Sequence, residues 1–324
     1  MNIIKDYRST ICFDTFTTLM KSEDPIWIGR YGGTDKFFFD PKKRETESEL
    51  EMSTFCKFCG FYYKNNKKLN EVIEKSTDIY KKSLKNCDLT TVGNINTITD
   101  IISNHNRDDD GNPIHDEILF NNKPLCAFNL IEDPYIFFKS FRIWGENKKI
   151  LIISPFSETI KYQTRKDRIN NLFKEEERDS FIFPNCEFVT YQTPITYNDN
   201  SGINSNYFNN VTEKYDNWIE HLEDMKKDIE KIDFDIAFIS CGVYAMPLGD
   251  FIKNIGKKSI YVGGILNMFF NIYGERYKGD SPNIHNLEYQ VDCMDKFDDL
   301  FDKKSNMFIA NSESISAYFR YYKK

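Results

Sequence analysis

The chain has 324 residues, of which 40% are hydrophobic, with a net charge of -7 and a pI near 5.4. This length is enough for a large core in one domain or two closely joined ones, and the acidic balance argues against a general nucleic-acid or membrane-surface binder. The N-terminus carries no basic-then-apolar signal, and no apolar run approaches the roughly 18 residues of a membrane span, so we expect a cytoplasmic protein without a transmembrane segment.

Short apolar runs predict strands at 26–30, 89–93, 150–156, 187–192, 234–240 and 259–262, with a further apolar run at 124–129. Helical patterns cover 6–20, 45–85, a stretch that ends near 144, 207–232 and 243–255. Because short strands joined by helices lie parallel, this alternation predicts an α/β protein with a mostly parallel sheet. We expect one domain over 1–324, with a helical C-terminal extension over 290–324.

The strand at 26–30 ends on Arg30 and leads through Tyr31 into the turn Gly32-Gly33-Thr34-Asp35, after which a helix is expected. A strand, a glycine-rich turn and a helix N-terminus together present backbone N–H groups that can bind a phosphate or a carboxylate. Thr34 or Asp35 can equally act as a plain helix N-cap, and Arg30 can equally form a structural ion pair. Both interpretations of this segment stay open.

Eight cysteines are scattered through the chain without a disulfide framework, which is expected of reduced thiols. Cys56 and Cys59 form one C-x-x-C pair inside the predicted helix 45–85. A single pair without a second one, or without suitably spaced histidines, is weak evidence for zinc. We therefore expect these two thiols to share a buried helix face.

The most acidic loop lies at 106–112, between His105 and His115. Asp108 and Asp110 are spaced to hold a divalent ion against a diphosphate. Five residues also fall at calcium-loop spacing: Asn106, Asp108, Asp110, Gly111 and Glu117. Asn replaces the usual first Asp of such a loop, and a proline stands where an apolar β-former is usual. A solvated turn is therefore the favoured interpretation.

Two later strand ends carry small or polar residues. Ser154 ends an apolar strand and precedes a helix that contains Lys161, a combination that suits a phosphate, although helix capping also explains the hydroxyls there. The β-α-β unit at 234–262 places Cys241-Gly242 and Gly263-Gly264 beyond the carboxyl ends of its two strands. Open parallel sheets bind their ligands at that edge, so we predict that this unit forms a wall of a binding site.

Three segments, within 26–35, 149–163 and 234–277, occur in the same order as in bacterial proteins encoded among polysaccharide-biosynthesis genes. They read IGRYGGTD at 28–35, KILIISPF at 149–156 followed by IKxQ at 160–163, and CGxYxMPL at 241–248 continuing to GKKSIYVGG at 256–264. More distantly, the pattern resembles glycosyltransferases of the GT-D fold. Their signature is an Arg-aromatic-Gly followed by an Asp-x-Glu pair after the first strand, with a glycine-containing strand-helix-strand near the C-terminus.

The resemblance implies a Rossmann-like sheet with helices on both faces, and a transferase that moves a sugar from a nucleoside diphosphate sugar, expected to be a UDP-sugar, to a glycan or other acceptor. It implies donor-binding roles for Arg30, Gly32, Gly33, Thr34, Ser154, Lys161, Gly242, Tyr244, Gly263 and Gly264. Asp35 and Glu132 are the candidates for a general base near the acceptor hydroxyl. Ordinary packing is the alternative for Tyr244.

The chain departs from the family pattern in the acidic pair. Gly33 stands where the family has its first acidic residue, and Asp35 stands where it has Glu. A divalent cofactor, Mn²⁺ or Mg²⁺, would therefore depend on Asp35, with Asp108 and Asp110 as further ligands if their loop folds back over the site. The departure favours a second hypothesis, a nucleotide- or phosphate-binding protein that is a hydrolase or a regulatory subunit of glycan assembly.

Overall fold

The computed structural model describes residues 10–31, 60–63, 66–92, 124–127, 129–194, 214–274, 284–295, 301–302 and 307–308. Seven of its strands form a single sheet in the order β3-β2-β1-β7-β6-β4-β5, and each neighbouring pair is parallel. The strands are β1 (Trp27–Tyr31), β2 (Leu89–Val92), β3 (Leu125–Ala127), β4 (Lys149–Ser154), β5 (Glu187–Gln192), β6 (Ile236–Ile239) and β7 (Lys258–Tyr261). The predicted α/β class with a parallel sheet is confirmed.

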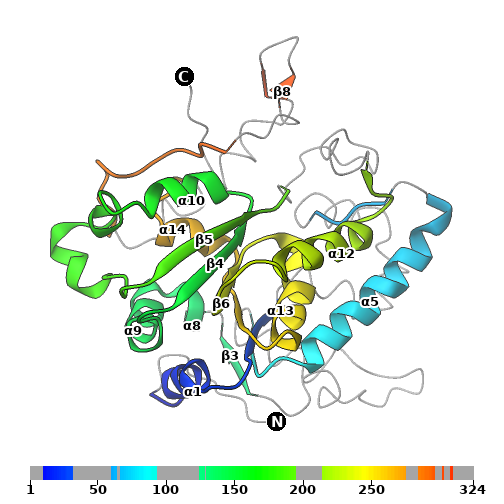
Figure 1. Ribbon diagram of the computed structural model, residues 1–324, viewed down its shortest axis with the longest axis horizontal. Helices are drawn as coiled ribbons and strands as arrows, with labels where there is room; N and C mark the ends of the chain where they lie inside the picture. The colour runs from blue at the N-terminus through cyan, green and yellow to red at the C-terminus, as the bar shows by residue number, and fades with distance from the viewer. Residues whose placement is uncertain are drawn as a thin grey trace.

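Helices cover both faces of this sheet (Figure 1). Those described are α1 (Thr10–Lys21), η1 (Asn66–Lys68), α5 (Leu69–Lys85), α8 (Asn129–Glu132), α9 (Pro134–Trp144), α10 (Ser157–Gln163), η2 (Ile169–Asn171), η3 (Glu175–Ser180), α12 (Trp218–Ile229), η5 (Gly242–Tyr244), α13 (Ala245–Asn254), η6 (Gly263–Ile265) and α14 (Leu266–Phe269). On one face α13 packs against β1, β6 and β7 and is flanked by α5 and α12. On the other face lie α1, α8, α9 and α14.

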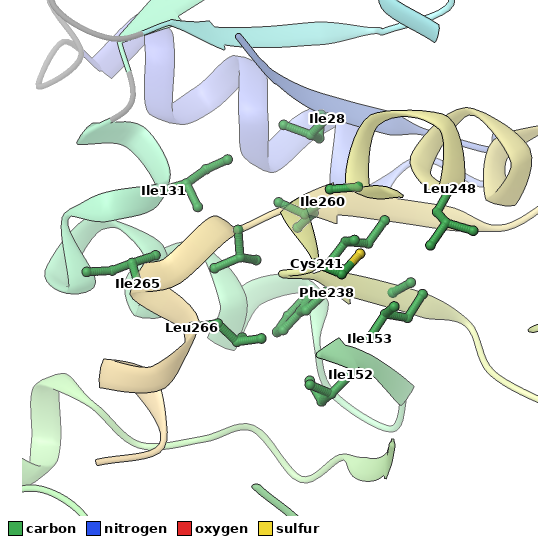
Figure 2. Packing of buried hydrophobic residues seen from close by; sticks show 14 of the residues in the cluster. Ile28, Ile131, Ile152, Ile153, Phe238, Cys241, Leu248, Ile260, Ile265 and Leu266 are labelled. Atoms are coloured by element: carbon green, nitrogen blue, oxygen red, sulfur yellow. The ribbon is translucent and has the colours of Figure 1, made fainter. Parts of the chain in front are cut away.

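A row of apolar side chains crosses four adjacent strands on the face covered by α8, α9 and α14, and it consists of Ile28, Ile260, Phe238 and Ile152 (Figure 2). Each is at most 1% exposed. Ile131 of α8 and Leu266 of α14 point toward this row in Figure 2. Burial of a side chain of this size stabilises the fold by about 1.5–3 kcal/mol. Packing of Ile131 on this row therefore holds α8 close to β1. The last residue of α8 is Glu132.

Local signals set the helix starts next to the sheet. Asp133 accepts hydrogen bonds from the backbone N–H groups of Tyr135 and Ile136 at 3.0 and 3.3 Å, and Pro134 occupies the first turn of α9. Asn217 caps α12 in the same way. These side chains satisfy N–H donors that have no partner within the helix.

Three expectations need correction. The predicted helix over 207–232 is interrupted at 215–217, and α12 begins only at Trp218, after its N-cap Asn217. The predicted helix over 45–85 is not continuous, because residues 60–63 are irregular and helix begins only at 66; residues 45–59, with Cys56 and Cys59, lie outside the described residues. The expected helical extension over 290–324 is wrong where it is described. Residues 290–295 are irregular, while β8 (Phe301–Asp302) and β9 (Met307–Phe308) pair as antiparallel strands.

Gly249 of α13 faces the buried indole of Trp27, and a Cβ built there would lie 2.1–2.4 Å from three of its carbons. Alanine favours a helix interior over glycine by about 1 kcal/mol. We nevertheless expect Gly249→Ala to lower the free energy of unfolding by about 2 kcal/mol, since the methyl group overlaps a rigid ring. Urea denaturation measures this loss. In a Trp27→Leu background the same change should cost little, and equal losses in both backgrounds would contradict the clash.

Candidate functional site at the carboxyl edge of the sheet

Arg30 and Gly263 meet at the carboxyl edge, where β1 and β7 lie side by side. A Cβ on Gly263 would lie 2.6 Å from Nη1 of Arg30, and the φ of this glycine is +72°. Both the close approach and the left-handed backbone require glycine at this position. The two segments that sequence reasoning placed at one edge of the sheet are therefore in contact.

Two further side chains hold the guanidinium of Arg30. Nη2 of Arg30 lies 2.5 Å from Oε1 of Glu132, and the guanidinium carbon lies 5.8 Å from the ring centroid of Tyr261. The Arg30 and Glu132 side chains are 19% and 34% exposed. The cation is thus positioned by an ion pair and an aromatic ring while part of it still reaches solvent.

The chain connections diverge at this point of the sheet. After β1 the chain continues to β2 on one side. After β7 it runs through η6 and α14 to Phe270, whose carbonyl accepts a hydrogen bond from Gln163 of α10, next to β4 and β5 on the other side. Open α/β sheets bind ligands beyond the carboxyl ends of their strands, which is where both of these segments leave the sheet. Fold and site together define an open parallel α/β protein with a candidate anion-binding edge at β1 and β7.

At the carboxyl end of β4, the polar groups that could bind a ligand are hydrogen-bonded to other groups of the protein. Ser154 is buried, and its Oγ accepts from the backbone N–H of Phe156. The carboxylate of Asp295 accepts from the backbone N–H groups of Glu158 and Thr159 at 2.8 and 3.1 Å, so these donors in the first turn of α10 are already occupied. Lys161 is exposed on α10. Burial raises the pKa of Asp295, while hydrogen bonds from Thr159 and the backbone oppose that shift.

Of the candidate residues after β6, Gly242 shapes the backbone turn and Tyr244 packs in the core. Gly242 has a φ of +58° in the turn that follows β6, and Gly264 continues η6 beside Gly263. The side chain of Tyr244 is fully buried, packs edge-on against Trp218, and its hydroxyl lies 3.2 Å from Nδ1 of His221. Tyr244 therefore belongs to the core under α12, and a donor-binding role for it remains a prediction.

Burial, together with the nearby charge of Lys214, lowers the pKa of His221 to about 4 from 6.5. The unfolded chain takes up this proton near pH 6.5 and the folded chain only near pH 4, so stability present above pH 6.5 is lost as the pH falls toward 4. Between pH 7 and pH 5 we expect a loss of about 2 kcal/mol in the free energy of unfolding from this group. Urea denaturation of His221→Gln should show a pH dependence weaker by that amount. The same pH dependence in both proteins would contradict this assignment.

Several candidate residues lie outside the described residues: Gly32, Gly33, Thr34, Asp35, Asp108 and Asp110. Their predicted roles therefore stay predictions. Within the part of the chain that the structure describes, no group of three His, Cys, Asp or Glu side chains could hold a metal ion. The carboxylate of Glu132 is already paired with Arg30, so the described residues of the site do not fit a divalent cofactor by themselves.

Sequence reasoning missed three residues near this edge. Tyr261 ends β7, two residues before Gly263. Its position at a predicted strand end could have marked it as a candidate site residue. Asp295 and His221 gave no such signal, because the residues they contact, Thr159 and Tyr244, lie in other segments of the chain.

Two open hollows lined by described residues lie at the opposite, amino edge of the sheet. Their volumes are about 380 and 420 Å³, and both are lined by Lys148 and Asp235. Charges of both signs surround them, with lysines and carboxylates side by side. We place the candidate site at the carboxyl edge instead, because ligands of open parallel sheets bind there.

No helix within the described residues is both long and apolar enough to span a membrane. No family model matches the chain, and neither does any curated protein. Among solved structures, a similar chain is the domain of unknown function 1792, described as having a distinct glycosyltransferase fold. The two chains are 11% identical with a TM-score of 0.40, over 89% of this chain and 88% of that one. Values this low define neither a family nor an activity for this chain.

Proposed function

We propose that this protein is a glycosyltransferase that transfers a sugar from a nucleoside diphosphate sugar, expected to be a UDP-sugar, to a glycan or other acceptor in polysaccharide or glycoconjugate biosynthesis. The observation that carries the proposal is Arg30, held against Gly263 at the carboxyl edge of a parallel sheet. A guanidinium matches the geometry of phosphate oxygens, and this edge is where such folds bind ligands.

In the proposed reaction the bond between the anomeric carbon and the diphosphate oxygen breaks while the acceptor oxygen bonds to that carbon. Negative charge develops on the leaving diphosphate, and a fixed cation stabilises it without reorganisation. Arg30 supplies that cation, and Tyr261 and Glu132 keep it in place. The acceptor hydroxyl loses its proton to a general base, for which Asp35 and Glu132 remain the candidates.

A divalent ion, when bound, would neutralise the same diphosphate charge. Its predicted ligands, Asp35, Asp108 and Asp110, are outside the described residues, so no step is assigned to it. The binding experiment below is therefore run with and without manganese.

The ion pair between Arg30 and Glu132 favours a second candidate, a nucleotide- or phosphate-binding protein without transferase activity. A carboxylate committed to an arginine is less available as a base for an acceptor hydroxyl. In that case the same edge binds the diphosphate, and the protein acts as a hydrolase or as a regulatory subunit of glycan assembly.

Isothermal titration with a panel of UDP-sugars and GDP-sugars, with and without manganese, tests both candidates. Binding accompanied by donor turnover that transfers the sugar to an added glycan acceptor supports the transferase, with slow hydrolysis as its side reaction when water replaces the acceptor. Donor hydrolysis that no acceptor diverts supports the hydrolase of the second candidate, and binding without any donor turnover supports its regulatory subunit. Absence of nucleotide affinity under all conditions removes both.

A further inference from the structure

Cys12 of α1 and Cys126 of β3 face each other in the core. Their Sγ atoms lie 2.6 Å apart, and both residues are 0% exposed. Two sulfur atoms at that separation overlap within their van der Waals radii. The arrangement is closer to a bonded pair, for which the S–S distance is about 2.05 Å, than to two independent thiols.

We propose that Cys12 and Cys126 form a disulfide that joins α1 to the edge strand β3. The two cysteines are 114 positions apart in the chain, so the bond would close a long loop. Cys87 provides a contrast within the same core, because its thiol donates to the carbonyl oxygen of Ser83. The expectation of reduced thiols would then not apply to this one pair.

The oxidant in this reaction is glutathione disulfide, a small disulfide that accepts the two electrons of the cysteine pair. The thiolate of one cysteine attacks a sulfur of glutathione disulfide, forming a mixed disulfide and releasing one glutathione thiolate. The second cysteine thiolate then attacks the protein sulfur of the mixed disulfide and displaces the second glutathione. Two protein thiols lose two electrons and two protons in total, and glutathione disulfide becomes two glutathione molecules.

The neighbouring Cys12 thiol and burial raise the pKa of the Cys126 thiol, which keeps it unreactive in the closed protein. Exchange therefore takes place while the chain folds or opens. Once formed, the bond fixes β3, and β3 is followed directly by α8 with Glu132 at its end. The disulfide would thus anchor the strand that precedes one residue of the candidate site.

The test is refolding of the full-length protein from urea, in parallel, with excess glutathione disulfide and with a reducing agent. Free thiols are then alkylated under denaturing conditions, and the peptides are identified by mass spectrometry. We expect peptides linked through Cys12 and Cys126 in the oxidised sample alone. Closure of so long a loop should raise the midpoint of thermal unfolding by about 5–10 °C relative to the reduced sample.

Cys87→Ser is the matched control, since it removes another buried thiol and should leave the link and the thermal shift intact. Cys126→Ser should abolish both. Alkylation of Cys12 and Cys126 to the same extent as Cys87 in the oxidised wild-type protein would overturn the proposal, as would their linkage to other cysteines. This alkylation measurement uses the wild-type protein, so its outcome does not depend on whether a variant folds.

Discussion

Replacing Arg30 with glutamine is expected to weaken the binding of a nucleoside diphosphate about 100-fold, which corresponds to about 2.7 kcal/mol. Glutamine keeps a polar side chain at the strand end but removes the charge that faces the phosphate oxygens. Because Arg30 is partly exposed and lies at the edge of the core, the variant should still fold. Isothermal titration measures the affinity, and circular dichroism verifies the fold.

Arg142→Gln is the matched control for this change. Arg142 lies on α9, is exposed, and donates to the backbone carbonyl of Asp179. Its loss removes one positive charge from the protein without touching the candidate site, so affinity should be unchanged. Glu132→Gln removes the partner of Arg30 but retains the cation, and it should keep most of the binding. If Arg30→Gln and Arg142→Gln bind equally well, the anion site lies elsewhere.

Truncation of Phe137 to alanine should lower the free energy of unfolding by about 4 kcal/mol, the typical cost of removing a buried phenyl ring. Phe137 of α9 is 0% exposed. Its ring stacks on Phe269 of α14 at 4.6 Å, meets Phe238 of β6 at 5.5 Å, and approaches Phe16 of α1 at 6.4 Å. The cavity would therefore open between three helices and the sheet. Urea denaturation measures the loss.

Tyr135→Ala, two residues earlier on α9, is the control for Phe137→Ala. Tyr135 is 40% exposed and donates its hydroxyl to Glu177 at the surface. Its ring contacts Phe181 at 4.7 Å, but it is far more exposed than Phe137, so its truncation should cost less, about 1–2 kcal/mol. Comparable losses for the two variants would show that Phe137 is not the centre of this packing.

The seven strands of the main sheet could be predicted closely from the sequence, to within two residues at each end, whereas β8 and β9 could not. Strands buried on both faces are continuous apolar runs, and such runs are local properties of a chain. The contact between Arg30 and Gly263 could also be predicted from the sequence, since the carboxyl ends of parallel strands share one edge. Each of these inferences needs only neighbouring residues and the parallel direction of strands joined by helices.

The partners of buried polar groups could not be predicted in this way. Asp295 accepts from backbone donors of α10, and Ser154 is buried with its Oγ bonded to the N–H of Phe156. Tyr244 pairs with His221 under α12, and Cys12 lies against Cys126 across the boundary between α1 and β3. These contacts join segments that are far apart in sequence.

For this protein, the sequence by itself determined the α/β class, the strands of the main sheet and the edge at which Arg30 and Gly263 meet, because apolar runs are local features of the chain and short strands joined by helices lie parallel. Only the tertiary structure decided that β1 lies next to β7, that Glu132 and Tyr261 hold Arg30, and which polar groups are buried with partners. The physical reason is that strand order and side-chain pairing depend on how distant segments pack together, and that packing leaves no periodic trace in the chain.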